Sequence, residues 1–268
     1  MNIFNSIKPT EEYRSYVTYG IAALAAESQN YSHKEVQKEL KDYLQIARPL
    51  RKEIGILLAY LQMVDKNQDG LNATIVSLIS MPLQESADFT FEPRLDRRIV
   101  EWEYLERFCH LIFQNQGSTA LGKSFRALCY LEENRDVEAK KWIDQALAQE
   151  PKNEMAMLTQ AHFLIKNLRR QEAATLLRST ELKKFPVGAL LLGKVCQDLN
   201  DQQCALENFR NAYLQNSNDV TRISPWARAN LSKEKEKLAK TWDLVKKGLE
   251  LQPHYKPLIE LRDQLESE

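Results

Sequence analysis

The sequence contains little glycine and no excess of charge of either sign. Only eight glycines occur among 268 residues, and the commonest residue types are ones that favour helices. This composition predicts an all-α protein with little or no sheet. Lysine and arginine together number 37, as do aspartate and glutamate, so no overall field attracts the chain to nucleic acid or to a membrane.

Long apolar runs and cysteine motifs are also missing. The longest apolar run, Ile54 to Val64, is interrupted by Gln62 and is too short to cross a bilayer, and the first residues lack the basic-then-apolar order of a secretory signal. The four cysteines show no CxxC spacing, which suits a reducing compartment, and Cys129 and Cys196 are expected in the core as free thiols. We therefore expect a soluble, cytoplasmic protein without membrane insertion.

Small residues recur in the second half of the chain at a period of about 34 residues. Three series keep the same offsets, namely Ala127, Ala161 and Gly193; Ala139, Ala173 and Ala205; and Ala146, Thr180 and Ala212. An apolar residue follows the second small residue of each unit at the same distance, as Ile143, Leu177 and Phe209. Parallel series of this kind predict pairs of helices that stack on one another, with the small residues where the helices cross.

These residues give the chain a resemblance to the tetratricopeptide repeat (TPR) family over about residues 120–253. The run RALCYLEENRDVEAKKWIDQALAQEP, residues 126–151, matches the family's pair of antiparallel helices with a proline closing the second helix. Three units fit clearly, and a fourth, ending at Pro253, is degenerate because Thr241 stands at a small position. The resemblance implies a right-handed α-solenoid of helix-turn-helix repeats.

Upstream of the repeats the sequence keeps a helical period but shows no repeat. We expect a helical N-terminal module over 1–82, a linker over 83–92, a connecting helix over 93–118, TPR-like repeats over 119–253 and a capping helix over 254–268. The linker corresponds to the one stretch without helical periodicity. Ser224 and Pro225 are interpreted as the cap and first-turn proline of the helix that opens the fourth unit.

One short motif suggests a metal ion. Asp65, Asn67, Asp69 and Gly70 match the opening of a helix-flanked calcium loop, but Val76 stands where the closing glutamate belongs. An Asp/Asn/Gly turn between two helices explains the same residues and is the favoured interpretation.

No other pattern indicates catalysis or a bound cofactor. The four histidines are scattered, and phosphate loops, nucleophile elbows and metal-ligand spacings do not occur. Basic clusters are interrupted by acidic residues and carry no interleaved aromatics. We therefore predict no enzyme activity, no cofactor, no metal site and no nucleic-acid partner.

The TPR resemblance implies a concave groove formed by the first helix of each unit. The residues that it places in the groove are Leu121, Ser124, Leu128, Leu131, Met155, Leu158, His162, Ile165, Val187, Leu190, Lys194 and Gln197. The groove is largely apolar and lacks the lysine and asparagine pattern with which some family members hold a C-terminal carboxylate. An apolar strip of this size should be covered. A partner's amphipathic helix or extended peptide is one occupant, and the chain's own N-terminal helices are the other.

The expected function is therefore non-catalytic protein binding. The chain is predicted to be a TPR-type adaptor or chaperone that holds a partner peptide or amphipathic helix in the apolar groove. The alternative is a structural subunit of a larger multiprotein assembly, and a homo-oligomer is compatible with either. The position of residues 10–28 distinguishes the two occupants of the groove. If these residues lie inside the groove, packing of the chain on itself replaces capture of a partner.

Overall fold

The computed structural model describes residues 11–27, 33–45, 50–83, 102–179, 181–231 and 235–267. Within these residues the regular structure is helical and no β-strand occurs, which confirms the predicted all-α class. The helices are α1 (Glu11–Glu27), α2 (His33–Tyr43), α3 (Arg51–Val64), α4 (Gln68–Ile79), α5 (Trp102–Gln116), α6 (Ala120–Glu132), α7 (Asp136–Gln149), α8 (Glu154–Lys166), α9 (Arg170–Ser179), α10 (Pro186–Asp198), α11 (Gln202–Gln215), α12 (Val220–Ala229), α13 (Lys235–Leu251) and α14 (Lys256–Ser267), with a short 3-10 helix over Glu181–Lys184. Most of the predicted linker and the start of the predicted connecting helix lie outside the described residues.

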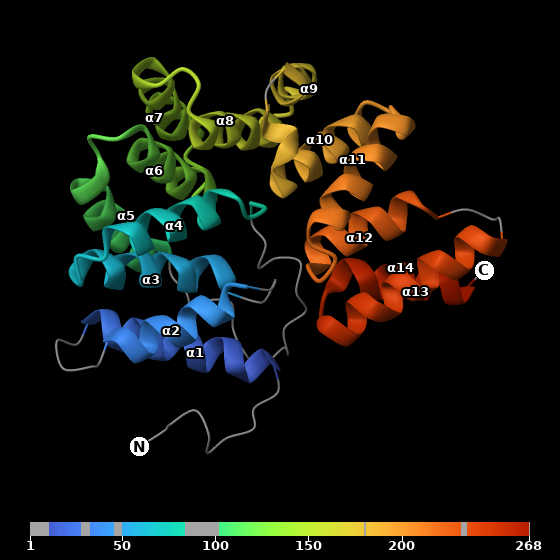
Figure 1. Ribbon diagram of the computed structural model, residues 1–268, viewed down its shortest axis with the longest axis horizontal. Helices are drawn as coiled ribbons and strands as arrows, with labels where there is room; N and C mark the ends of the chain where they lie inside the picture. The colour runs from blue at the N-terminus through green and yellow to red at the C-terminus, as the bar shows by residue number, and fades with distance from the viewer. Residues whose placement is uncertain are drawn as a thin grey trace.

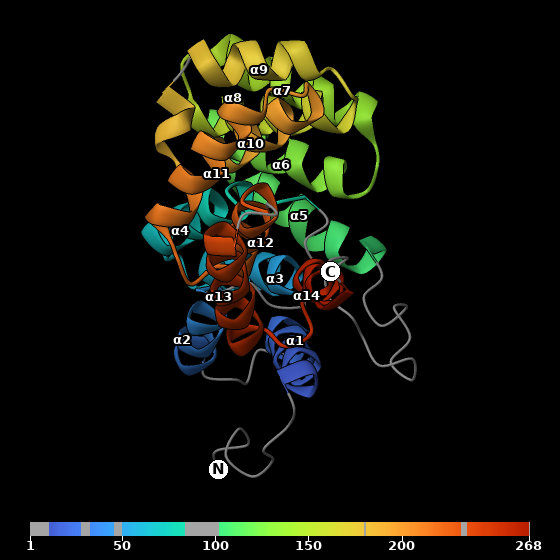
Figure 2. The same cartoon turned by 90° about the vertical axis from the view of Figure 1, so that its right-hand side faces the viewer.

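The helices follow an arc in which each one packs against the next in sequence, except that α5 packs against α3 and not chiefly against α4. In Figure 1 the chain rises through α5 and α6, crosses the top at α7 to α9, and descends through α10 to α14. Seen from the side, α10 to α13 lie in front of the earlier helices (Figure 2). Helix α3 packs against α1, α2, α4 and α5 and is the centre of the N-terminal module. Helix α4 also packs against α6 and α8, so it lies on the inner side of the arc.

The recurring small residues lie where the helices cross. Every described member of the three series is buried, as are Ile143, Leu177 and Phe209, so the prediction that these are packing positions is confirmed. Thr180 lies outside the described residues. Gly193 shows why a small residue is needed, because a Cβ atom added there would lie 2.5 Å from Cδ1 of Phe209.

The turns inside three helix pairs, α6–α7, α8–α9 and α10–α11, share one backbone geometry. Asn134, Leu168 and Asn200 adopt positive φ values of 61°, 57° and 60°. In each turn the next residue donates its N–H to a carbonyl five residues earlier, as from Arg135 to Tyr130 over 2.9 Å. This is a Schellman-type helix end, which satisfies the last carbonyl groups of the first helix.

The same turn joins α3 to α4, in the module where the sequence shows no repeat. Lys66 has φ of 56°, and the N–H of Asn67 donates to the carbonyl oxygen of Gln62 over 2.8 Å. Asn67 also caps α4, since its side chain accepts a hydrogen bond from the N–H of Gly70. The structure therefore gives the N-terminal module a hairpin like those of the repeats, and it places an Asp/Asn/Gly turn where the calcium-like motif occurs.

The helix that opens the fourth unit begins earlier than predicted. Helix α12 starts at Val220, after Asp219, whose carboxylate accepts hydrogen bonds from the N–H and Oγ of Thr221. Pro225 lies inside the helix, so the expectation that Ser224 caps it is wrong. Asp219 supplies the N-cap, and the helix continues through Pro225, its sixth residue, although a proline has no N–H to donate to the carbonyl of Thr221.

Candidate functional site

The structure buries most of the residues that the sequence places in the groove. Those buried are Ser124, Leu128, Leu131, Met155, Leu158, His162, Val187 and Leu190; Leu121 and Ile165 are half-buried; Lys194 and Gln197 are exposed. The groove is therefore closed along α6 and α8 and open only near the end of α10. Helix α1, the described part of residues 10–28, packs against α2 and α3.

Helix α4 and the residues that follow it cover the closed part. Nε2 of His162 lies 3.2 Å from the carbonyl oxygen of Ile79 at the end of α4. Burial, with a smaller effect from nearby Lys52, lowers the pKa of His162 from 6.5 to about 3. The imidazole is thus neutral and serves as a hydrogen-bond donor inside the protein. The sequence left two possible occupants of the groove, a segment of a partner or the chain's own N-terminal helices. In the described structure the chain itself occupies the closed part.

A buried ion pair holds this covering segment in place. Nζ of Lys52 donates to the carbonyl oxygen of Pro82 over 2.7 Å and pairs with the carboxylate of Glu132 at the end of α6. Both side chains of the pair are nearly excluded from solvent. Breaking such a pair leaves a charge in a medium of low dielectric constant, so its geometry is firmly determined.

The open part of the arc forms a pocket beside α10, α12 and α14, which we call the open pocket. It has a volume of about 220 Å³ and is lined by Pro82, Lys194, Gln197, Phe209, Thr221, Ser224, Pro225, Arg228, Tyr255 and Pro257. Its lining contains two cationic side chains and no carboxylate. A volume below the 300–1,000 Å³ typical of small-molecule sites suits a single side chain or a chain terminus.

The walls of the open pocket are fixed by contacts to distant parts of the chain. Nη2 of Arg228 donates to the carbonyl oxygen of Pro257 over 3.1 Å and lies 3.8 Å from a carboxylate oxygen of Glu260. On the other side, Nη1 of Arg51 in α3 lies 3.9 Å from the carboxylate of Asp219, which caps α12. The N-terminal module therefore helps to position α12.

All four cysteines are paired, and the expectation of free thiols is wrong. Cys109 of α5 is bonded to Cys129 of α6, and Cys196 of α10 to Cys204 of α11. The expectation that Cys129 and Cys196 are buried is confirmed. Their partners lie 20 and 8 residues away in sequence, and such spacings do not reveal which helix faces meet.

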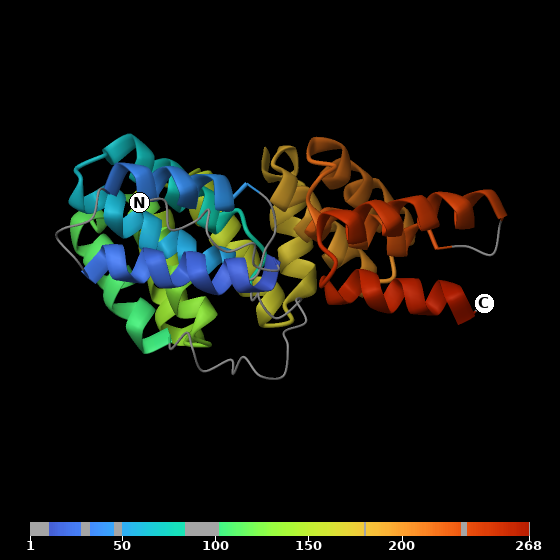
Figure 3. The same ribbon diagram turned by 90° about the horizontal axis from the view of Figure 1, so that it is seen from below.

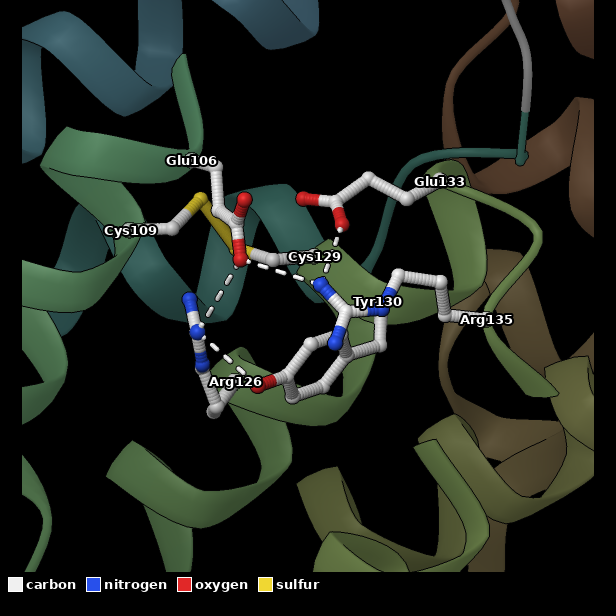
Figure 4. Close-up of a disulfide and its surroundings, with 7 residues drawn as sticks. All are labelled: Glu106, Cys109, Arg126, Cys129, Tyr130, Glu133 and Arg135. Carbon is white, nitrogen blue, oxygen red and sulfur yellow. Dashed lines mark hydrogen bonds and ion pairs between the residues drawn. A yellow bond between two sulfur atoms is a disulfide. The ribbon is translucent and has the colours of Figure 1, made fainter. Parts of the chain in front are cut away.

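A compact charge network borders the Cys109–Cys129 disulfide (Figure 4). The guanidinium groups of Arg126 and Arg135 each lie over the ring of Tyr130, at 4.4 and 4.5 Å from its centroid. Glu106 pairs with both arginines, at 3.4 and 3.1 Å. Burial, followed by repulsion from Glu106, raises the pKa of Glu133 above its ordinary value. The network joins α5 to the turn after α6, and we interpret it as structural.

One group of side chains in the described part of the chain has the composition of a metal site. Donor atoms of Cys196, Asp201 and Cys204 lie within 4.8 Å of one another. However, Nη2 of Arg178 lies 3.2 Å from the carboxylate of Asp201 and 3.5 and 3.6 Å from the two sulfur atoms. A guanidinium at this position competes with a metal cation. The spacing of these three residues matches no metal-ligand motif, so the sequence alone does not reveal the cluster.

Comparison with models of known protein families yields no match, and comparison with curated proteins yields none. Among the described helices, none combines the length and the apolar character needed to cross a membrane.

Proposed function

We propose that this protein is a non-catalytic helical-repeat scaffold that binds an acidic segment of another protein at the open pocket. In this proposal α6 to α13 are four units of a right-handed α-solenoid of the TPR kind. The recurring Schellman turns and the buried small residues support that architecture. The cytoplasmic location stays a prediction, and the two cysteine pairs remove the cysteine argument for it.

The observation that carries the proposal is the division of the inner face into a covered part and an open part. Most apolar residues along α6 and α8 are already buried where α4 packs against these helices, so they offer little surface to a partner. The open pocket instead presents the exposed side chains of Lys194, Arg228 and Gln197. Cationic groups with additional hydrogen-bonding side chains favour a carboxylate.

The test is a binding measurement with a short fluorescein-labelled peptide of alternating glutamate and alanine. The variant Lys194→Glu/Arg228→Glu should weaken binding by about tenfold or more, because it reverses both charges of the pocket. A matched control, Lys141→Glu/Arg210→Glu, makes the same change in net charge at two exposed positions on second helices. Equal loss in both variants would show that only overall charge matters and would overturn the assignment of this pocket.

A second candidate, a subunit of a larger assembly, is favoured by a separate feature of the C-terminal helices. Helices α13 and α14 run side by side at the end of the arc (Figure 3). A largely apolar hollow of about 270 Å³ there is lined by Trp242, Val245, Lys246, Leu249, Glu250 and Arg262. If this end contacts a second copy, sedimentation analysis should show a dimer that Trp242→Glu converts to a monomer. A wild-type monomer at all concentrations would remove a homo-oligomer.

A further inference from the structure

The two disulfides differ in their access to solvent. Cys109 and Cys129 are both buried, and the charge network of Figure 4 lies beside them. In the second pair, Cys196 is buried whereas Cys204 is half-exposed at the start of α11. Of these four cysteines, only Cys204 is therefore partly accessible to solvent.

Two hydrogen-bond donors lie close to the sulfur atom of Cys204. Nη2 of Arg178 lies 3.6 Å from Sγ of Cys204 and 3.5 Å from Sγ of Cys196, and Nδ2 of Asn208 lies 3.6 Å from Sγ of Cys204. The main-chain N–H of Cys204 donates to Asp201, the N-cap of α11, so the sulfur belongs to the first turn of a helix. A cation, an amide donor and a helix N-terminus each stabilise a thiolate relative to a thiol.

Each of the acidic groups near the sulfur atoms has a partner of its own. The carboxylate of Asp201 faces the sulfur atoms from the start of α11, but it is paired with Arg178 over 3.2 Å. Asp198, at the end of α10, is paired with Arg170 over 3.0 Å. Glu207, one turn further along α11, accepts a hydrogen bond from Gln203. Arg178 is the charged group that contacts both sulfur atoms.

We propose that Cys196 and Cys204 form a thiol–disulfide exchange site for low-molecular-weight thiols and disulfides of the glutathione type. Cys204 is the sulfur that reacts with the small molecule, and Cys196 is the resolving cysteine. This reactivity is independent of the open pocket, although both lie on the α10–α11 hairpin.

Each step of the exchange is balanced. A small thiolate attacks Sγ of Cys204, so that a mixed disulfide forms, the Cys196–Cys204 bond breaks, and Cys196 leaves as a thiolate, which takes up a proton. A second small thiolate attacks the small-molecule sulfur atom of the mixed disulfide, which releases a small disulfide and the Cys204 thiolate. Two small thiols are thereby oxidised and the protein disulfide is reduced. The reverse sequence forms the protein disulfide at the expense of a small disulfide.

The test uses the folded, full-length protein in glutathione buffers of stepped redox potential. Newly exposed thiols are alkylated with iodoacetamide and located by mass spectrometry, while circular dichroism follows the fold. We expect Cys196–Cys204 to open in the folded protein, with a glutathione adduct on Cys204, while Cys109–Cys129 stays closed until the protein unfolds. Opening of both disulfides together, or of neither before unfolding, would overturn the proposal.

Variants separate thiolate stabilisation from simple exposure. Arg178→Gln should slow alkylation of reduced Cys204 at neutral pH by roughly three- to tenfold and move the pH midpoint of the reaction upward. A rise of one unit in the thiol pKa lowers the thiolate fraction about tenfold, and the greater nucleophilicity of the more basic thiolate offsets part of this loss. Arg169→Gln, at an exposed position directly before the same helix where the side chain pairs with Glu172, is the matched control. Equal rates in wild type and Arg178→Gln would contradict the role of Arg178.

Two further measurements address resolution and metal binding. Cys196→Ser, if its circular dichroism is unchanged, should accumulate the mixed disulfide of Cys204 with glutathione, since nothing displaces it. Failure of that adduct to accumulate in the folded variant would exclude Cys196 as the resolving cysteine. Zinc alone should not protect the reduced wild-type protein from alkylation. Stoichiometric protection by zinc would assign Cys196, Asp201 and Cys204 to a metal site instead.

Discussion

Nε2 of His162 donates a hydrogen bond to the main-chain carbonyl oxygen of Ile79 over 3.2 Å, across 83 residues of sequence. A carbonyl oxygen only accepts, so Nε2 carries the proton. Burial lowers the pKa of the ring to about 3, so the ring is neutral at ordinary pH. The contact joins α8 to the end of α4, at one of the positions that the TPR resemblance assigns to a ligand groove. In this protein the inner face along α6 and α8 is therefore part of the core.

This histidine should make stability depend on pH. Its pKa is about 3 in the folded protein and 6.5 as the ordinary value, so the unfolded chain binds more protons between these limits. The contribution of His162 to the free energy of unfolding is thus fully present above pH 6.5. It falls on acidification towards pH 3, by at most about 1.4 kcal/mol per pH unit. Urea unfolding at pH 7.5 and 5.5 measures this, and His162→Gln should reduce the slope, whereas His110→Gln, at an exposed position, should not. An identical slope in all three proteins would contradict the prediction.

Gly193 should tolerate no side chain. Gly193→Ala places a methyl group 2.5 Å from the Phe209 ring, and overpacking of this kind costs about 1–3 kcal/mol. Thermal or urea unfolding provides the measurement. Gly20→Ala in α1 is the control, because an added Cβ meets no atom within 4 Å and alanine favours a helix by about 0.5–1 kcal/mol. Adding Phe209→Leu to Gly193→Ala should recover part of the loss if the clash is its cause.

The Lys52–Glu132 pair should matter far more than a surface pair. Lys52→Met removes the cation that faces a buried carboxylate and should cost about 3–5 kcal/mol in free energy of unfolding. The double variant Lys52→Met/Glu132→Gln should lose less, because no charge is left buried. Lys140→Met, which breaks the exposed pair with Asp144, should cost under about 1 kcal/mol. Similar losses for the buried and exposed pairs would contradict the burial seen in the structure.

The turn between α3 and α4 should behave as a helix cap and not as a calcium loop. Asn67→Ala removes the acceptor for the N–H of Gly70 and should cost about 1 kcal/mol, whereas Asn67→Asp keeps a capping oxygen and should cost little. Millimolar calcium should leave the Tm of the wild-type protein unchanged. A Tm that rises with calcium concentration would instead show an ion bound to the folded state.

Part of this architecture follows from the sequence alone, because the signals involved are local. The helix boundaries depend on apolar residues spaced at helical intervals and on caps a few residues away. The small residues at 127, 161 and 193 and their counterparts indicate crossing points through a period that needs no knowledge of the fold. The sequence alone does not decide where α12 starts, because Asp219 and Ser224 both suit an N-cap.

Tertiary structure alone decided what fills the inner face and which cysteines pair. Periodicity shows that a helix has an apolar side but not which other helix covers it. The contacts that settle this point join residues about 80 positions apart, such as His162 with Ile79 and Lys52 with Glu132. The proximity of Arg178 to both sulfur atoms likewise depends on how α9, α10 and α11 pack. Such long-range contacts arise only when the helices close into an arc. The sequence pattern therefore predicts an open groove, whereas in the folded protein the chain itself fills that groove.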